Sequence, residues 1–161
     1  MLAHCTHPQI HEMIHIKIAI LLLLSLVLRI GLAQDAAQPR LPTTALTAGM
    51  HVIQAELAST PTQQMVGMMH RHTMGANEGM LFVYDEPAAH CFWMRNTLLP
   101  LTIAFIGDDG RIVHLADMKP LDESSHCTPV PVRFALEMNQ GWFAKRGMKK
   151  GDRLRGAPFG N

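Results

Sequence analysis

The sequence predicts a mainly β (α+β) domain, a small barrel-like or rolled sheet of about seven short strands with one or two short helices. Three observations support this fold class. Short segments alternate apolar and polar residues with a period of two, as strands do. Gly, Pro, Asn and Asp separate these segments at the spacing of turns. Helical spacing occurs only in short stretches of the chain.

The first strand predicted is residues 51–58, "HVIQAELA", where Ile53, Ala55 and Leu57 alternate with a mixed face. A helix should follow, because Ser59 or Thr60 can cap it and Pro61 suits its first position. Met65, Met68 and Met69 have i, i+3, i+4 spacing, so we expect them on one helical face.

Residues 79–84 and 90–97 are β-prone, and "DEPAA" between them should interrupt the strand at Pro87. Residues 101–118 have the pattern of a hairpin that turns at Asp109-Gly110. Residues 130–139 alternate again and predict a further strand. The chain then closes with a short turn or helix bounded by glycines.

The N-terminus resembles a signal peptide, because residues 18–28 are apolar apart from Ser25 and follow Lys17. We predict a leader over residues 1–33, cut between Ala33 and Gln34, and hence a periplasmic or secreted protein. Met1 and Met13 are both possible starts. An uncleaved leader that acts as a membrane anchor remains the alternative, and membrane contact is expected only through it.

The remaining chain divides into a flexible linker at 34–45, a single β-rich domain at 46–155 and a tail at 156–161. Without Lys17, Arg29 and Glu12 of the leader, the 14 basic and 13 acidic residues become 12 and 12. This balance gives no reason to expect a nucleic-acid partner. Six basic residues crowd positions 145–155, either as a solvated face or as a site for phosphate, lipid headgroup or acidic glycan.

Cys5 lies in the leader, which leaves Cys91 and Cys127 as the thiols of the mature chain. An even pair in an exported protein predicts a disulfide, with free thiols or metal ligation as the alternatives. The bond would close a loop of about 37 residues and contribute on the order of 4 kcal/mol in the chain-entropy account.

Several motifs together carry a family resemblance: "GMMHR" (67–71), "GMLFVY" (79–84), "FWMRNTLLPLTIAFI" (92–106), "DGRIV" (109–113), "ALEMNQGW" (135–142) and "GD" (151–152). With them, residues 46–155 resemble the domain of unknown function 192 family, also called uncharacterised protein family 0127. The resemblance implies a small, mainly β fold, often exported, with no established activity. Where the family often has Arg, this chain has Gln64, which weakens an anion-binding hypothesis.

Five residues form the candidate ligand groove. Trp93 is the stacking platform, since neighbouring Met94 should face the opposite way on a strand. The polar groups are Arg71, Asn96, Thr97 and Glu137. Two alternatives stay open: Asn96-Thr97 could simply end the strand in a turn, and Arg71 could form a structural ion pair with Glu137.

No spacing in the chain matches a known catalytic motif, so we assign no catalytic residue and no cofactor. The leading hypothesis is a non-catalytic binding or accessory module of the cell envelope, whose partner is an unknown small ligand, an envelope glycan or a protein. One alternative is a soft-metal protein that holds copper or zinc through His70, His72 and Met74. Another is a hydrolase-like enzyme that uses the His90-Cys91 and His126-Cys127 pairs.

Overall fold

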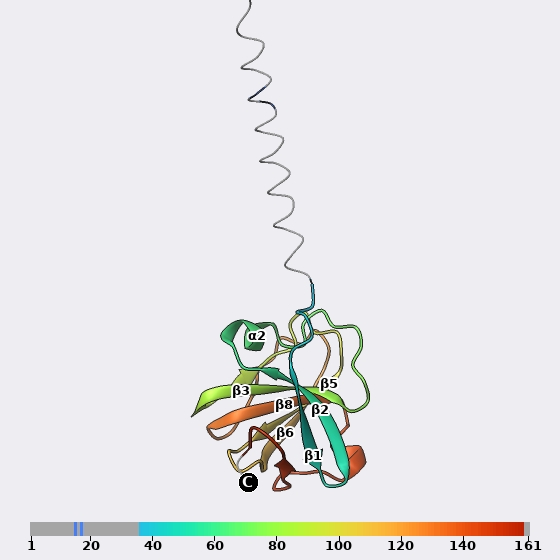
Figure 1. Cartoon of the computed structure of the whole chain (residues 1–161), viewed down its shortest axis with the longest axis vertical. Helices are drawn as coiled ribbons and strands as arrows, with labels where there is room; N and C mark the ends of the chain where they lie inside the picture. The colour runs from blue at the N-terminus through green and yellow to red at the C-terminus, as the bar shows by residue number, and fades with distance from the viewer. Residues whose placement is uncertain (1–14, 16, 18–35, 160–161) are drawn as a thin grey trace, which may run out of the picture. The chain divides into compact units, whose positions relative to one another are not determined.

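One curled sheet of seven strands organises the chain, in the order β6-β5-β8-β3-β2-β1-β9 (Figure 1). Only β2 and β3 run parallel; the other neighbours are antiparallel. A separate two-stranded sheet joins β4 to β7. The strands are β1 Thr43–Ala48, β2 His51–Ala58, β3 Glu78–Ala88, β4 Cys91–Phe92, β5 Leu101–Ile106, β6 Ile112–Met118, β7 His126–Cys127, β8 Val132–Asn139 and β9 Leu154–Arg155.

These elements come from a computed structural model that describes residues 15, 17 and 36–159. The predicted leader and its cleavage point between Ala33 and Gln34 lie almost entirely outside the described residues. Within the described part of the chain, no helix has the length and apolar character needed to cross a membrane.

The two edges of the sheet approach each other at one end. Arg111, just before β6, forms an isolated bridge with Arg153, just before β9. The Leu154 N–H donates to the Gly110 carbonyl at 2.8 Å, and the Ile112 N–H donates to Asp152 at 2.8 Å. The sheet is therefore rolled and partly closed, which confirms the predicted fold class.

The sheet is covered by a hydrophobic cluster on each face, because successive residues of a strand point to opposite sides. On β3, Leu81 belongs to one cluster, whereas Met80 and Phe82 belong to the other. Every residue of β5 is buried, which explains its continuous apolar sequence "LTIAFI".

The predicted helix forms, but it is short: α2 covers Pro61–Val66. Thr60, one of the two expected caps, closes its N-terminus through a capping box with Gln63. The expected methionine face is wrong, because Gly67 adopts a φ of 50° and ends the helix. Met65 is consequently 70% exposed on α2, while Met68 lies beyond the helix and is buried.

Other differences arise from pairing that spans long stretches of sequence. β3 continues through Pro87 to Ala88, across a register shift that lets the strand bend. The predicted strand at 90–97 shortens to β4, and its last residues form a turn. Of the segment expected as linker, Thr43 and Thr44 lie in β1, and Gln38 donates from its side chain to the Gly67 carbonyl.

The hairpin at 101–118 forms as predicted, with β5 and β6 joined through Asp109-Gly110. β2 has the predicted bounds, and β8 begins two residues inside its predicted range. The closing segment contains a single turn of 3₁₀ helix, η1 (Ala144–Arg146).

Candidate functional site

Two glutamates lie in one row across the sheet. Glu56 on β2 pairs in register with Met80 on β3, and Met80 pairs with Glu137 on β8. Both glutamates are nearly inaccessible, at 3% and 4% exposure. Burial of a carboxylate is costly unless a cation or hydrogen-bond donors compensate it, so the surroundings of each glutamate decide its charge.

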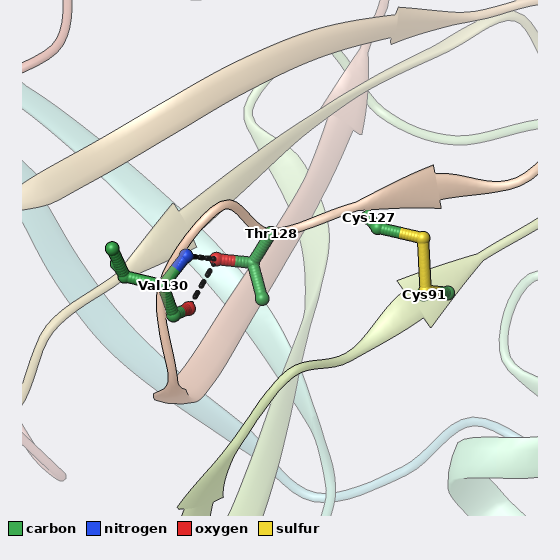
Figure 2. The surroundings of a disulfide bond; sticks show 4 residues. All are labelled: Cys91, Cys127, Thr128 and Val130. Carbon is green, nitrogen blue, oxygen red and sulfur yellow. Dashed lines mark hydrogen bonds between the residues drawn. A yellow bond between two sulfur atoms is a disulfide. The ribbon is translucent and has the colours of Figure 1, made fainter.

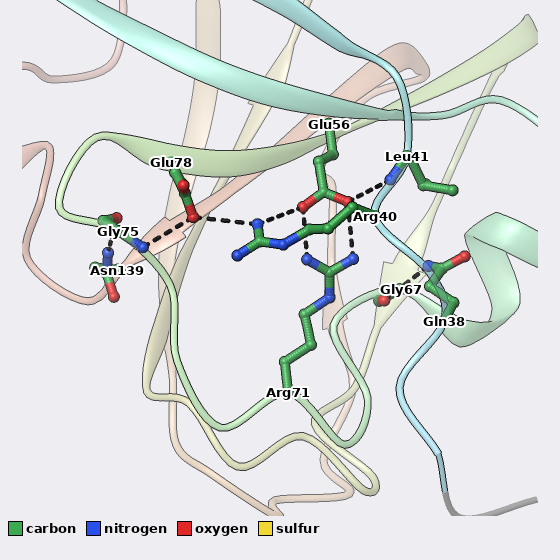
Figure 3. Close-up of polar contacts among 9 residues, drawn as sticks. All are labelled: Gln38, Arg40, Leu41, Glu56, Gly67, Arg71, Gly75, Glu78 and Asn139. Atoms are coloured by element: carbon green, nitrogen blue, oxygen red, sulfur yellow. Dashed lines mark hydrogen bonds and ion pairs between the residues drawn. The ribbon is translucent and has the colours of Figure 1, made fainter.

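The buried charge of Glu56 is compensated by hydrogen-bond donors on both carboxyl oxygens (Figure 3). Arg71 Nη1 and Nη2 donate to its two carboxyl oxygens at 2.5 and 2.8 Å, a bidentate pair. Arg40 Nη1 and the Leu41 N–H add hydrogen bonds at 2.7 and 2.8 Å. Burial tends to raise the pKa of Glu56, but these donors outweigh it and hold that pKa below its ordinary value.

This pairing answers one question that the sequence left open. Arg71 is the partner of Glu56, so the ion pair with Glu137 that the sequence left open does not form. The sequence offered little signal for the true partner, because Glu56 is 15 residues from Arg71 in an unremarkable alternating strand.

Glu137 has a different environment. Its Oε2 is buried and has no hydrogen-bond partner in the part of the chain that the structure describes. Burial raises the pKa of Glu137 to about 8, with no basic group to oppose it. The carboxyl group is therefore mostly protonated at neutral pH. Burial, together with the nearby Glu137, also raises the pKa of Tyr84 to about 12.

Glu137 lines a surface cavity of about 210 Å³, which we call the Glu137 pocket. β3 and the segment around β4 supply four aromatic side chains, α2 and the turn after it supply methionines, and Gln64 and Thr97 add polar groups. The residues of the Glu137 pocket are Gln64, Met65, Val66, Gly67, Met68, Met69, Phe82, Tyr84, Cys91, Phe92, Trp93, Thr97 and Glu137.

The structure brings three of the five candidate groove residues together in this pocket: Trp93, Thr97 and Glu137. Trp93 is 46% exposed, and its neighbour Met94 is fully buried, so the two side chains do face opposite ways. Asn96 is outside the pocket lining. Its φ of 56° and its carbonyl, which accepts from the His70 N–H at 2.8 Å, place it in a turn.

Arg71 also lies outside the lining of the Glu137 pocket. It contributes instead to a shallow depression shared with His70 and His72. Met74, the third residue proposed for soft metal, packs against the hydrophobic cluster that contains Phe82. Among the described residues, no group of three or more His, Cys, Asp or Glu side chains is arranged to hold a metal ion.

Cys91 and Cys127 form a disulfide that joins β4 to β7 (Figure 2). The two cysteines are direct partners in the register of this small sheet. Beyond Cys127, the Thr128 side chain closes the next turn by donating to the Val130 carbonyl at 2.6 Å. Because Cys91 also lines the Glu137 pocket, the disulfide fixes part of the pocket wall.

The paired cysteines alter the chemistry available to the two His-Cys dipeptides. A sulfur in a disulfide is not a thiolate, so neither cysteine is a nucleophile in this state. His90 stacks on Tyr84 with ring centroids 3.5 Å apart, and burial lowers the pKa of His90. The arrangement is thus a disulfide flanked by histidines rather than a Cys/His dyad.

Comparison with known proteins shows the family of this chain. The family model for DUF192, described as "Uncharacterized ACR, COG1430", matches residues 44–156. The chain belongs to the DUF192 family. This agrees with the resemblance found in the sequence motifs, and it leaves the biochemical role open because the family has no established function.

Two solved structures are similar to this DUF192 protein. A protein from Sinorhizobium meliloti 1021, named as a candidate transcription regulator, has 34% identity and a TM-score of 0.70, over 74% of this chain and 98% of that one. A protein of unknown function from Novosphingobium aromaticivorans DSM 12444 has 36% identity and a TM-score of 0.66, over 75% and 94%. No curated protein matches the sequence.

Sequence reasoning missed several residues of the Glu137 pocket. Phe82, Tyr84 and Phe92 belong to motifs that the sequence suggested only as strands. A weak signal was present, because Phe82 and Tyr84 alternate on one face of β3 and thus point toward the same side as Met80. What the sequence could not indicate is that α2 and the segment after β4 meet over this face.

The pocket has the chemistry of a binding site. Its walls are apolar and aromatic. Its lining includes one buried carboxylic acid, Glu137, and one exposed indole, Trp93. Nothing in its lining resembles a nucleophile beside a base, because the two titratable side chains are Glu137 and Tyr84, and the pKa of each is raised.

Proposed function

We propose that this DUF192 protein is a non-catalytic binding module of the cell envelope that holds a small ligand in the Glu137 pocket. One observation carries the proposal: Glu137 is a buried acid at a pocket lined by aromatic side chains, and its Oε2 has no hydrogen-bond partner within residues 36–159. Buried polar groups in folded proteins nearly always have a partner, so such a group at a pocket indicates that a ligand supplies it.

The size and exposure of the pocket also support this proposal. A cavity of about 210 Å³ is smaller than the pockets that enclose drug-sized molecules, so we expect a small ligand or a single head group. Trp93 presents a large apolar surface to solvent, and Met65 on α2 is exposed as well. Covering these two side chains would make ligand binding favourable beyond the contact with Glu137.

An envelope location is part of the proposal. It is supported by the leader-like apolar segment 18–28 and by the disulfide, since disulfides persist mainly in oxidising compartments. Fractionation of cells that express the full-length protein tests it. Recovery in the envelope or medium, with a mature N-terminus at Gln34, is expected; recovery only in the cytoplasm contradicts it.

A nucleic-acid partner is not part of the proposal, although one similar protein is named as a candidate transcription regulator. The chain has a formal net charge of only +1. Two basic residues of the C-terminal cluster are also engaged within the protein, because Arg146 stacks on Trp142 and Arg153 pairs with Asp109. These features give little electrostatic drive toward phosphate backbones.

The proposal is tested by tryptophan fluorescence quenching of the full-length protein. Trp93 is 46% exposed and Trp142 is 2% exposed, so an aqueous quencher reports mainly on Trp93. Small neutral sugars, organic cations, organic anions, Cu(I), Cu(II) and Zn(II) form the screen. We expect one organic class to protect Trp93 from quenching and to raise the melting temperature.

Two variants serve as controls in this screen. Trp93→Phe should remove the quenching signal of the site, and Glu137→Gln should weaken the thermal stabilisation. Stabilisation by a metal ion alone, unchanged in Glu137→Gln, would favour the soft-metal alternative. If no small molecule protects Trp93, the pocket is not a small-ligand site and the proposal is wrong.

A further inference from the structure

We infer that the ligand of the Glu137 pocket is a small organic cation with a substituted ammonium group, which neutralises Glu137 and lies against the aromatic walls. This inference rests on the proposed function and names the class of its ligand. It is carried by the charges in the pocket, by the nature of its walls and by comparison with the second buried glutamate in the same row.

The pocket lining contains an acidic group but no basic group. Its lining contains no Lys, Arg or His, and Glu137 is its one carboxylic acid. A ligand that carries a carboxylate or phosphate would meet an acid and no cation there. A ligand that carries a positive charge would find a carboxyl group that can ionise and whose buried Oε2 has no hydrogen-bond partner among the described residues.

The walls also suit a cation. Phe82, Tyr84, Phe92 and Trp93 line the cavity, and the rings of Phe82 and Phe92 meet edge to face with centroids 4.9 Å apart. The faces of aromatic rings attract cations, and recognition of quaternary ammonium groups in proteins commonly uses such aromatic surfaces. Methionine thioethers, here from α2 and the following turn, add a polarizable apolar surface.

Glu56 shows how the same fold accommodates a buried glutamate. There the chain supplies a cation, because the guanidinium group of Arg71 pairs with both carboxyl oxygens. At Glu137 no corresponding cation is present among the described residues, and Glu137 is one of the residues that line the pocket. An external cation would neutralise the carboxylate of Glu137, as Arg71 neutralises the carboxylate of Glu56.

Binding of a permanent cation has a defined proton balance. Below the pKa of Glu137, the carboxyl group gives up its proton as the cation enters, so one proton passes to solvent and the carboxylate pairs with the ammonium group. Affinity should therefore rise with pH until the pKa, about 8, and then level off.

Other charged groups near the site bear on this pH dependence. Arg95 lies over the Trp93 ring, 5.6 Å from its centroid. His90 stacks on Tyr84, and burial lowers its pKa. The further titratable side chains on the elements around Glu137 are Glu78, Tyr84, Asp85 and Glu86 on β3, His51 and Glu56 on β2, Arg133 on β8, His114 and Asp117 on β6, His126 on β7, and His70 and Arg71 after α2.

The test is calorimetric titration of the full-length protein with choline and with 3,3-dimethylbutan-1-ol, its neutral carbon analogue. Titrations at pH 6, 7, 8 and 9 in two buffers of different ionisation enthalpy give the affinity and the number of protons released. For choline we expect release of close to one proton at pH 6 and 7, about half a proton at pH 8 and about a tenth at pH 9, with an affinity that rises about tenfold per pH unit well below pH 8. The neutral analogue should bind more weakly and release none.

Glu137→Gln is the matched variant and should bind choline weakly with no pH dependence. If this variant does not fold, proton release by the wild-type protein still decides the question. Equal binding of the neutral analogue without proton release would overturn the cationic ligand and leave the binding module standing. Failure of both compounds and of every other small probe to protect Trp93 would remove the proposed function as well.

Vesicles identify the source of the cation. Cosedimentation with phosphatidylcholine vesicles, but not with phosphatidylglycerol vesicles, would show that the protein binds the head group on a membrane. Binding of free choline without cosedimentation would show a soluble ligand. Binding to phosphatidylglycerol vesicles alone, with no response to choline, would contradict the inference.

Discussion

Glu56 and Glu137 lie on either side of Met80 in one row of the sheet, both nearly inaccessible to solvent, yet among the described residues only Glu56 has a cationic partner. Strands are about 4.8 Å apart, so the two carboxyl groups come from positions about 10 Å apart in the same sheet. One glutamate belongs to the scaffold, and the other is available for function.

Replacement of Arg71 should destabilise the fold strongly. Arg71→Met leaves the buried carboxylate of Glu56 without its bidentate partner, and we expect a loss of about 3 kcal/mol in the free energy of unfolding. Arg40→Met is the control, because Arg40 is 58% exposed and should cost less than about 1 kcal/mol. Urea denaturation measures both. Equal losses in the two variants would show that Arg71 is not the main partner of Glu56.

The stability of the protein should depend on pH through Glu137. Its folded pKa of about 8 lies above the ordinary value of 4.5, so its stabilising contribution is complete below pH 4.5 and is lost as pH rises toward 8. Glu137→Gln removes this dependence. The wild-type free energy of unfolding, minus that of the variant, should fall between pH 4.5 and 8 by at most about 1.4 kcal/mol per pH unit. A difference that is constant over this range, in parallel urea titrations, would be evidence against a raised pKa.

The disulfide should contribute substantially to stability. It closes a sequence separation of 36 residues, and the double variant Cys91→Ser, Cys127→Ser should lose on the order of 4 kcal/mol. A thiol assay on unreduced, denatured protein should count one thiol, Cys5, when the leader is present, and none when it is cleaved. Two additional thiols would mean that Cys91 and Cys127 are not joined.

Substitutions at Trp93 and at Met94 should distinguish an effect on ligand binding from an effect on stability. Trp93 is exposed and lines the pocket, so Trp93→Ala should change the free energy of unfolding by less than about 1 kcal/mol while ligand binding is lost. Met94 is fully buried, and Met94→Ala should cost about 2 to 5 kcal/mol. Circular dichroism during urea denaturation compares them without relying on tryptophan. A large loss of stability in Trp93→Ala would assign the indole to the core.

The sequence predicted the strands with local signals well. β2 and the hairpin of β5 and β6 depend on alternation and on the Asp109-Gly110 turn, which are visible within a few residues. β7 and β9 are short and depend on partners far along the chain, at Cys91 and at Ala48 and Thr47. The sequence held no local signal for such pairings, so both strands were missed.

The candidate site was predicted only in part, again because the sequence shows local motifs but not which distant segments meet. Trp93, Thr97 and Glu137 were found because their motifs are distinctive, and they do share a pocket. The position of Arg71 was misjudged, because the sequence shows which charges are available but not which strand lies opposite. The methionine stripe was wrong because a single backbone conformation, at Gly67, separates Met65 from Met68.

A carbon-13 NMR titration of the Glu137 carboxyl group, with and without choline, tests directly whether this buried acid binds the cation. We predict that Glu137 titrates with a pKa of about 8 in the free protein and that saturating choline lowers this pKa. A Glu137 that titrates near 4.5 in the free protein, or a raised pKa that choline leaves unchanged, would contradict the account.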